Sequence, residues 1–393
     1  MSMKSLKVGI TTLVLLLIIA LPIFLIEPAK QVESSGSANN AVNIDDSFKL
    51  NWQKKYYKDF GYNQNGSKIK ISLHDNGEAQ IAVYHAKEPY MSYYDKEKAE
   101  WTVVENTWWE HGVPEILWAG DGVFLAKITG MANIISSFDG ITWYNAGCSK
   151  NAKNSITTGA YDNKQEVGVV SWWYNKTPVY YSSNSLTERT EWTLATGTEE
   201  TTNPIFKYLK GLFGIEDQPT VPIFSYLTAH NGLFVGVVGG ERSIAVADPA
   251  NLEEWTTTIP EQSDTYYMFI RSINAKLFVM KYRYDGDLFN VNLCMLSDDG
   301  TELTETNLSH VGDLADNHIP NPQNIIWMED WGKYALFTEG MLYISDDGLT
   351  WEGIKQKELI TTNSDTFDGA IYVPGDGFYV NASDYVYYAP YSK

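Results

Sequence analysis

A short turn motif recurs along the chain and constrains its fold more than any other feature. Residues Ser137–Trp143 and Ser345–Trp351 both read S-x-D-G-x-T-W, and Ser297–Thr301 keeps only the first half. The aspartate accepts hydrogen bonds from turn amides, the glycine supplies a backbone angle that other residues resist, and the tryptophan begins a returning strand. The motif predicts a stapled β-hairpin built from Ser137, Asp139, Gly140, Thr142, Trp143, Ser297, Asp299, Gly300, Ser345, Asp347, Gly348, Thr350 and Trp351.

Weaker copies of this turn motif fill the intervals, and the tryptophans stand at positions 101, 143, 192, 255 and 351. The spacings are 42, 49, 63 and 96 residues, and the widest interval holds the copy without tryptophan. A further strand–turn–strand pair precedes each copy, for example residues 115–126 with Asp121-Gly122 at the turn. A four-stranded repeat of about 40–50 residues is typical of a β-propeller blade. Residues 69–351 therefore predict six blades.

The two ends of the repeat region predict one more blade. Residues 370–388 supply three strand-like segments after the sixth unit, but a fourth is missing. At the other end, Phe48–Trp52 resembles an unpaired fourth strand, with Trp52 in the position of the motif tryptophan. Pairing these segments would remove both sheet edges. We expect an all-β, seven-bladed propeller of four-stranded antiparallel blades, with six blades as the alternative if residues 69–104 are irregular.

The turn motifs resemble the Asp-box of the bacterial neuraminidase (BNR) repeat, and the region from Phe48 onward looks like a sialidase-like propeller of that family. The resemblance implies that the boxes join the third and fourth strands of a blade, on the face opposite the ligand. It does not extend to sialidase activity, because no Arg-Ile-Pro motif occurs and no arginine precedes Arg189. The family's three-arginine clamp on a sugar carboxylate cannot be assembled in the same way. The chain is expected to be a non-sialidase member.

The opposite face of such a propeller carries the loops between second and third strands and those between blades. Aromatic side chains in these loops stack on sugars or on partner side chains, or else pack between blades. Paired acids there are the alternative candidates for glycoside cleavage. The ligand-face candidates are Trp108, Trp109, His111, Trp172, Trp173, Tyr174, Tyr282, Tyr284, Asp285, Asp287, Asp313 and Asp316.

The N-terminal region predicts a membrane anchor. Residues 8–26 carry no charge and are long enough to span a bilayer as a helix. Lys4 and Lys7 precede this run and no lysine follows until Lys30, which places residues 1–7 in the cytoplasm and the remainder outside. Residues 27–46 predict a flexible linker, and residues 47–393 the propeller, with a helical insertion at about 203–214. Secretion after signal cleavage is the alternative.

Composition excludes several functions. The formal charge is −20, which argues against nucleic acid as a partner, and two cysteines exclude a disulfide framework. The sequence contains no serine-hydrolase motif G-x-S-x-G, no phosphate-binding motif G-x-x-x-x-G-K-S/T and no zinc-protease motif H-E-x-x-H. We therefore expect no cofactor and no metal. The sequence predicts a membrane-anchored binding or scaffold module for a protein or glycan, without catalysis. The alternative is a glycan-cleaving enzyme of unassigned specificity.

Overall fold

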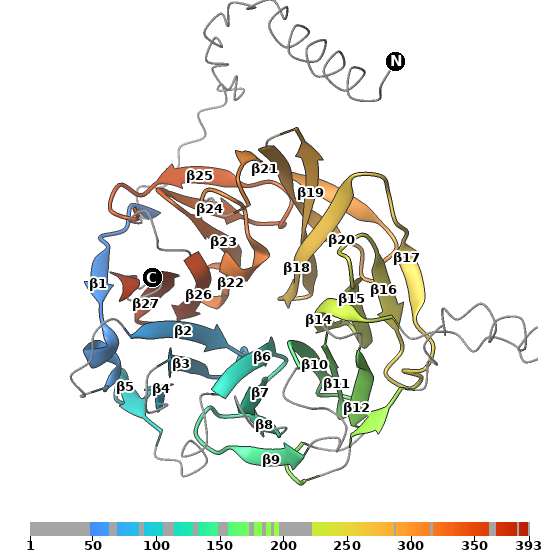
Figure 1. The fold of residues 1–393 in the computed structure, drawn as a ribbon. Coiled ribbons are helices and arrows are strands. Elements are labelled where there is room, and N and C mark those ends of the chain that lie inside the picture. The colour runs from blue at the N-terminus through green and yellow to red at the C-terminus, as the bar shows by residue number, and fades with distance from the viewer. Residues whose placement is uncertain are drawn as a thin grey trace, which may run out of the picture. The chain divides into compact units, whose positions relative to one another are not determined.

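The computed structural model shows a seven-bladed β-propeller whose blades are four-stranded antiparallel sheets (Figure 1). The structure describes residues 48–62, 69–85, 90–104, 114–128, 133–147, 156–172, 177–182, 186–189, 192–195, 222–286, 288–314, 317–360, 367–382 and 385–391. The predicted anchor, linker and helical insertion lie outside these ranges. Among the described residues, no helix has the length and apolar character needed to cross a membrane.

Blades I to VI follow one another along the chain, and the first strand of each blade lies closest to the centre of the ring (Figure 1). Blade I holds β2 (Lys70–Asp75), β3 (Gln80–His85), β4 (Tyr90–Asp95) and β5 (Glu100–Val103). Blade II holds β6 (Pro114–Gly120), β7 (Val123–Ile128), β8 (Ile134–Ser137) and β9 (Tyr144–Gly147). Blade III holds β10 (Thr158–Asp162), β11 (Val167–Trp172), β12 (Thr177–Ser182) and β13 (Thr193–Leu194).

The next three blades repeat this order, and blade V has much longer strands than the others. Blade IV holds β14 (Phe224–His230), β15 (Leu233–Val238), β16 (Ile244–Ala247) and β17 (Thr256–Ile259). Blade V holds β18 (Thr265–Ile273), β19 (Lys276–Asp285), β20 (Leu288–Leu296) and β21 (Leu303–Gly312). Blade VI holds β22 (Ile325–Met328), β23 (Lys333–Thr338), β24 (Met341–Ser345) and β25 (Glu352–Lys355). Short 3-10 turns flank β22 at Pro322–Asn324 and Glu329–Trp331.

Blade VII joins the two ends of the propeller. Its inner strands are β26 (Phe367–Val373), β27 (Gly377–Ala382) and β28 (Tyr385–Pro390), and its outer strand is β1 (Gln53–Lys55). Lys54 of β1 is opposite Tyr387 of β28, and the rings of Trp52 and Tyr387 lie 6.3 Å apart, edge to face. The prediction of seven blades closed by the N-terminal segment is confirmed, and the six-bladed alternative is wrong. The closing strand itself is Gln53–Lys55, which directly follows the predicted strand Phe48–Trp52.

A buried glutamine of blade VI holds the segment that leads into this closing strand. The Gln356 carboxamide oxygen accepts hydrogen bonds from the Trp52 indole at 3.0 Å and from the Leu50 amide at 3.3 Å. Its nitrogen donates to the carbonyl of Phe48 at 2.9 Å. Because all three bonds are buried, loss of the Gln356 carboxamide would leave buried donors and acceptors of this segment unpaired.

The turn motifs form the predicted staples. In blade VI, Asp347 Oδ1 accepts from the backbone amides of Leu349 and Thr350, both at 2.8 Å. The Trp351 indole donates back to the carbonyl of Gly348 at 2.9 Å. Blade II repeats the pattern: Asp139 Oδ1 accepts from the amides of Ile141 at 2.8 Å and Thr142 at 2.7 Å, and the Trp143 indole donates to the Gly140 carbonyl at 3.1 Å. In blade V, Asp299 Oδ1 accepts from the Thr301 amide at 3.1 Å and from the Ser297 hydroxyl at 2.6 Å.

The motif glycines also press each blade against the preceding one. Gly140 has φ +73°, and a Cβ placed there would lie 2.6 Å from Ile81 in blade I. A Cβ at Gly348 would lie 2.9 Å from the ring of Phe278 in blade V. Glycine is therefore required twice at these positions, by the backbone angle and by the close approach of the neighbouring sheet.

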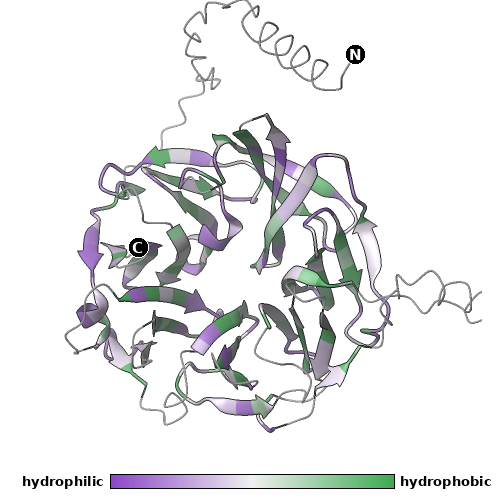
Figure 2. Ribbon diagram, viewed as in Figure 1, coloured by the Kyte–Doolittle hydropathy of each residue, from purple (hydrophilic) through white to green (hydrophobic). Residues whose placement is uncertain are grey.

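The hydrophobic core is divided among the contacts between neighbouring blades. One cluster joins blades VI and VII, and another joins blades VII and I, where Phe60, Trp101 and Tyr379 meet. Figure 2 shows the strongly hydrophobic residues mainly on inner strands, whereas the outer strand β17 is paler. The ring surrounds a channel lined by the first strands, and this channel positions the candidate site.

Candidate functional site

The channel contains a cavity of about 230 Å³ bounded by the first strands of several blades. A second cavity of about 370 Å³ shares part of this lining and extends toward the turns that join first and second strands. We call the side of the ring with these turns and the turn motifs the motif face. The residues common to both cavities are Asp75, Ala119, Arg271 and Ser272.

Arg271 brings a fixed positive charge into the channel. It lies in β18 of blade V, and its Nη1 donates to the carbonyl oxygens of Gln323 at 2.6 Å and Ile325 at 3.1 Å. These carbonyls belong to the start of blade VI, so the guanidinium also joins two blades. Burial lowers the pKa of Arg271, although an arginine remains charged at neutral pH.

Asp75 brings a negative charge to the same cavities from blade I. It is the last residue of β2, and its Oδ1 accepts from the Gly77 amide at 2.8 Å and the Gln80 side chain at 3.3 Å. Burial raises the pKa of Asp75, against the opposing effect of these hydrogen bonds and of the Arg271 and Lys96 charges. The carboxylate is thus partly desolvated without a cation in direct contact.

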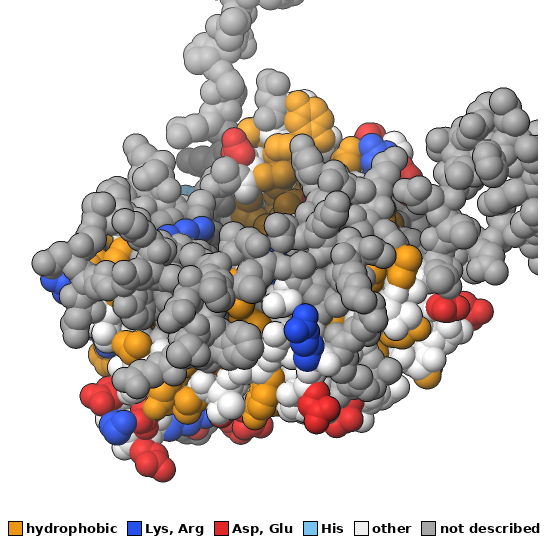
Figure 3. Space-filling model, turned by 60° about the horizontal axis from the view of Figure 1, so that its bottom comes forward, with side chains coloured by type: hydrophobic (Ala, Val, Ile, Leu, Met, Phe, Trp, Pro, Cys, Tyr) orange, Lys and Arg blue, Asp and Glu red, His pale blue; other side chains and the backbone are white. Residues whose placement is uncertain are grey.

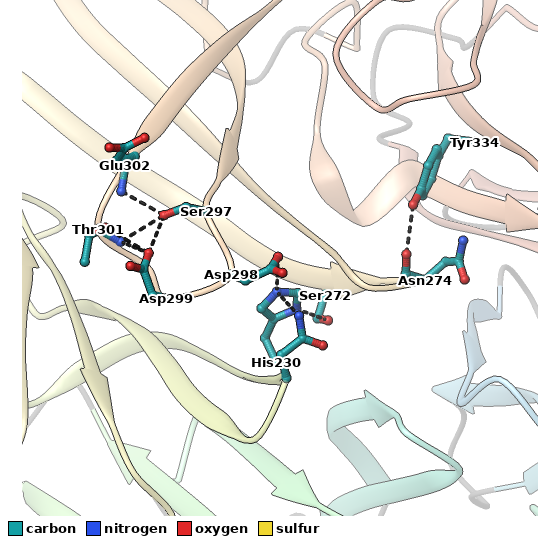
Figure 4. Close-up of polar contacts among 10 residues, drawn as sticks. His230, Ser272, Asn274, Ser297, Asp298, Asp299, Thr301, Glu302 and Tyr334 are labelled. Carbon is teal, nitrogen blue, oxygen red and sulfur yellow. Dashed lines mark hydrogen bonds and ion pairs between the residues drawn. The ribbon is translucent and has the colours of Figure 1, made fainter.

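A histidine at the end of β14 links blades IV and V beside the channel (Figure 4). The buried His230 ring has Nδ1 2.9 Å from Ser272 Oγ, and Nε2 3.4 Å from Asp298 Oδ1 and 3.2 Å from Asn231 Nδ2. Burial lowers the pKa of His230, which favours the neutral ring.

The contacts of this histidine fit two tautomers. With the ring proton on Nδ1, the ring donates to Ser272, and Nε2 accepts from the Asn231 amide. With the ring proton on Nε2, the ring donates to the Asp298 carboxylate, and Nδ1 accepts from the Ser272 hydroxyl. In both tautomers the ring joins β14 of blade IV to blade V.

The predicted ligand-face residues that the structure describes belong to blade V and the segment after it. Tyr282 is buried, stacks on Tyr266 with ring centroids 5.1 Å apart, and donates to Glu241 at 2.8 Å. Tyr284 is 55% exposed near the end of β19, and Asp313 is exposed just after β21. The structure packs Tyr282 between strands and presents Tyr284 to solvent.

The other candidates are not placed by the structure. Trp172 is the last residue of β11 and Asp285 is the last residue of β19, but the structure describes only their backbones. The remaining candidates lie wholly outside the described residues: Trp108, Trp109, His111, Trp173, Tyr174, Asp287 and Asp316. Their role on the ligand face stays a prediction.

Sequence reasoning missed the channel residues. Asp75, His230 and Ser272 stand at or near the end of a first strand, and two of them directly precede an Asn-Gly turn. A polar residue at that point of several repeats is a usable signal, because all first strands end at the same rim of the ring. Within the described ranges, no group of three His, Cys, Asp or Glu side chains is placed to hold a metal ion.

Comparison with known proteins shows the fold of the chain. No family model matches the chain, and no curated protein matches it in sequence. A streptogramin B lyase structure has 9% identity, covers 86% of this chain and 97% of its own, and gives a TM-score of 0.52. YCF48 bound to D1 peptide has 12% identity, coverages of 87% and 97%, and a TM-score of 0.50. An inactive virginiamycin B lyase from Staphylococcus aureus with quinupristin has 10% identity, coverages of 87% and 99%, and a TM-score of 0.50. These likenesses show the β-propeller fold alone.

Proposed function

We propose that this chain is a membrane-tethered propeller of the Asp-box type that acts outside the cytoplasm as a non-catalytic binding or scaffold module. The hydrogen-bonded turns of blades II, V and VI support the Asp-box assignment. The uncharged run at residues 8–26, preceded by Lys4 and Lys7, supports the anchor and its orientation.

The observation that carries the binding role is the charged channel. Arg271 and Asp75 come from different blades and are each held by hydrogen bonds to nearby backbone. Side chains fixed in advance lose little conformational entropy when a ligand binds. The indole of Trp118 lines the same cavity and adds apolar contact area.

A protein partner is favoured over a glycan. One propeller of similar fold was solved with a bound D1 peptide, which supports a peptide segment as a ligand for this architecture. Among the described residues visible in Figure 3, acidic and basic side chains lie in small separate groups.

The proposal is tested by partner capture with the full-length protein in lipid nanodiscs. Bound membrane proteins and glycans are compared between the wild type and the double variant Arg271→Gln/Asp75→Asn. We expect the double variant to lose at least tenfold of the captured partner while its unfolding temperature stays within a few degrees.

Two further variants control this experiment. Arg242→Gln removes an arginine whose ion pair with Glu261 lies at the surface, and it should leave capture unchanged. Trp172→Ala/Trp173→Ala tests the ligand-face candidates predicted from sequence. Loss of capture only in the tryptophan variant would move the binding site away from the channel, and capture that no variant alters would contradict both locations.

Glycan cleavage is the second candidate, and one observation favours it. Asp75, Asp121 and Glu329 line the 370 Å³ cavity together, and the raised pKa of Asp75 suits a general acid. Turnover on a panel of polysaccharides and aryl glycosides, lost in Asp75→Asn, would establish this activity. The same panel without turnover would eliminate it.

A further inference from the structure

Two opposite charges line the channel without neutralising each other directly. Among the described residues, Asp75 and Arg271 form no ion pair, although each influences the pKa of the other. Both groups are partly desolvated, which is costly for a charge without a close counter-charge. A ligand that supplies both missing counter-charges would bring a larger gain than one that supplies either alone.

Each group also keeps hydrogen-bonding capacity. The hydrogen bonds of Arg271 all use Nη1, so Nε and Nη2 have no partner among the described residues. The contacts of Asp75 all use Oδ1, so Oδ2 has none there either. The guanidinium can therefore hold a carboxylate through two parallel N–H bonds, and the carboxylate can accept from an ammonium group.

The charge pattern selects against simple ions. An anion that binds Arg271 is repelled by Asp75, and a cation that binds Asp75 is repelled by Arg271. A molecule that carries both charges avoids both penalties. The half-buried His74 also lines this cavity, with Nε2 3.1 Å from Ser72 Oγ, and it adds a polar rather than an apolar wall.

The size and lining of the cavity limit the ligand further. The smaller cavity, of about 230 Å³, is below the roughly 300–1,000 Å³ typical of sites for drug-sized ligands, and the adjoining cavity of about 370 Å³, which shares Asp75 and Arg271, is at the low end of that range. Leu73, Ile270 and Ile371 line the smaller cavity together with the two charges, so a short aliphatic skeleton has apolar surface to contact. The site suits a molecule of amino-acid size.

From these observations we infer that the channel binds an amino-carboxylate: a short aliphatic skeleton whose carboxylate is held by Arg271 and whose ammonium group is held by Asp75. This chemistry comes from a free amino acid or from a chain end with a C-terminal lysine. The inference rests on the proposed function, since it names the ligand chemistry of the same channel.

Titration with matched small molecules tests the inference. Binding to the purified full-length protein is measured at pH 7 by calorimetry and by the shift in unfolding temperature. The probes are norleucine and 6-aminohexanoate, which carry both charges, and hexanoate and hexylamine, which carry one each. We expect at least one of the two zwitterions to bind tenfold or more tightly than either single-charge probe.

Substitutions locate the binding. Arg271→Gln and Asp75→Asn should each weaken zwitterion binding at least tenfold, and Arg242→Gln should leave it unchanged. Arg271→Gln should also abolish the preference for norleucine over hexylamine. Hexanoate or hexylamine binding as tightly as the zwitterions, or affinity that neither channel variant alters, would overturn the inference.

A peptide arm distinguishes the two sources of the ligand. An N-acetylated hexapeptide that ends in lysine is compared with its C-terminal amide. Tight binding of the free acid only, with the same dependence on Arg271, would support a chain end as the ligand. If all zwitterionic probes fail while partner capture still depends on the channel, this inference is wrong and the proposed function stands; failure of both removes the function as well.

Discussion

The aspartates of the turn motifs and Asp75 of the channel have identical side chains but differ in burial. Asp347 lies at the surface and accepts backbone hydrogen bonds from its own turn, which lower its pKa. Asp75 also accepts from an amide of its own turn, that of Gly77, but its carboxylate is half-buried and burial raises its pKa. The comparison teaches that hydrogen bonds within the turn stabilise an exposed carboxylate and the fold around it. A half-buried carboxylate with one oxygen unused retains capacity for a ligand.

The largest expected effect comes from removing a motif tryptophan. Trp351 is 4% exposed and anchors the turn of Asp347 through its indole. Trp351→Ala should lower the free energy of unfolding by about 3–5 kcal/mol, because a large buried side chain leaves a cavity. Urea unfolding measures the change. Ile141→Ala, at a 44% exposed position in the blade II motif, should cost far less. Equal losses in the two variants would contradict the role of the indole.

A motif glycine should come next. Gly140→Ala is expected to cost about 2–4 kcal/mol, since it adds the strain of positive φ to a clash with Ile81. Gly232→Ala separates the two causes, because Gly232 has φ +77° with nothing within 4 Å of the added Cβ. Its cost should be about 1–2 kcal/mol. Thermal unfolding that shows no difference between the two variants would mean that the blade contact is unimportant.

The two aspartates should respond to pH in opposite directions. Because hydrogen bonds lower the pKa of Asp347, its contribution is present above about pH 4 and is lost as pH falls through the folded-state pKa. Asp347→Asn should therefore cost about 1–2 kcal/mol at pH 7 and flatten the loss of stability in acid.

For Asp75 the sign is reversed. Because burial raises its pKa, the folded state loses stability as pH rises from about 4 through the higher folded-state pKa. Asp75→Asn removes this penalty and should raise the unfolding temperature at pH 7. Unfolding measured from pH 3 to 8 compares both variants with the wild type. Shifts of the same sign at pH 7 would break the comparison.

The smallest effect is expected at His230. Burial lowers its pKa, so the stability it confers is complete above pH 6.5 and is lost as pH falls through the lower folded-state pKa. His230→Gln should remove that part of the slope. His310→Gln, at a half-exposed histidine in blade V, is the control. If the free energy of unfolding of His230→Gln depends on pH as it does in the wild type, other groups cause the loss of stability in acid.

Much of the fold was predictable because its signals are local. The motif turn is hydrogen-bonded within itself from Ser345 to Trp351, so seven consecutive residues specify its conformation. The closing strand was predictable for a related reason: Trp52 supplied the position that the last blade lacked.

The candidate site was not predictable in the same way. Asp75 and Arg271 are almost two hundred residues apart, and only closure of the ring brings them to one cavity. The repeat pattern also does not predict strand length. The strands of blade V have nine or ten residues, whereas β13 has two. The channel residues and the strand lengths differ from one repeat to the next, so the similarity between repeats does not predict them.

The closing of blade VII has a consequence for biosynthesis. The chain from Phe48 to Lys55 leaves the ribosome before any blade, yet it pairs with β28 and with Gln356, which lies more than 300 residues later. At about 5–20 residues per second, the early segment waits on the order of 15–60 s for its partners. During that delay the side chains of Trp52 and Leu50 are exposed, so chaperones can bind the segment before β1 until the last blade has been synthesised.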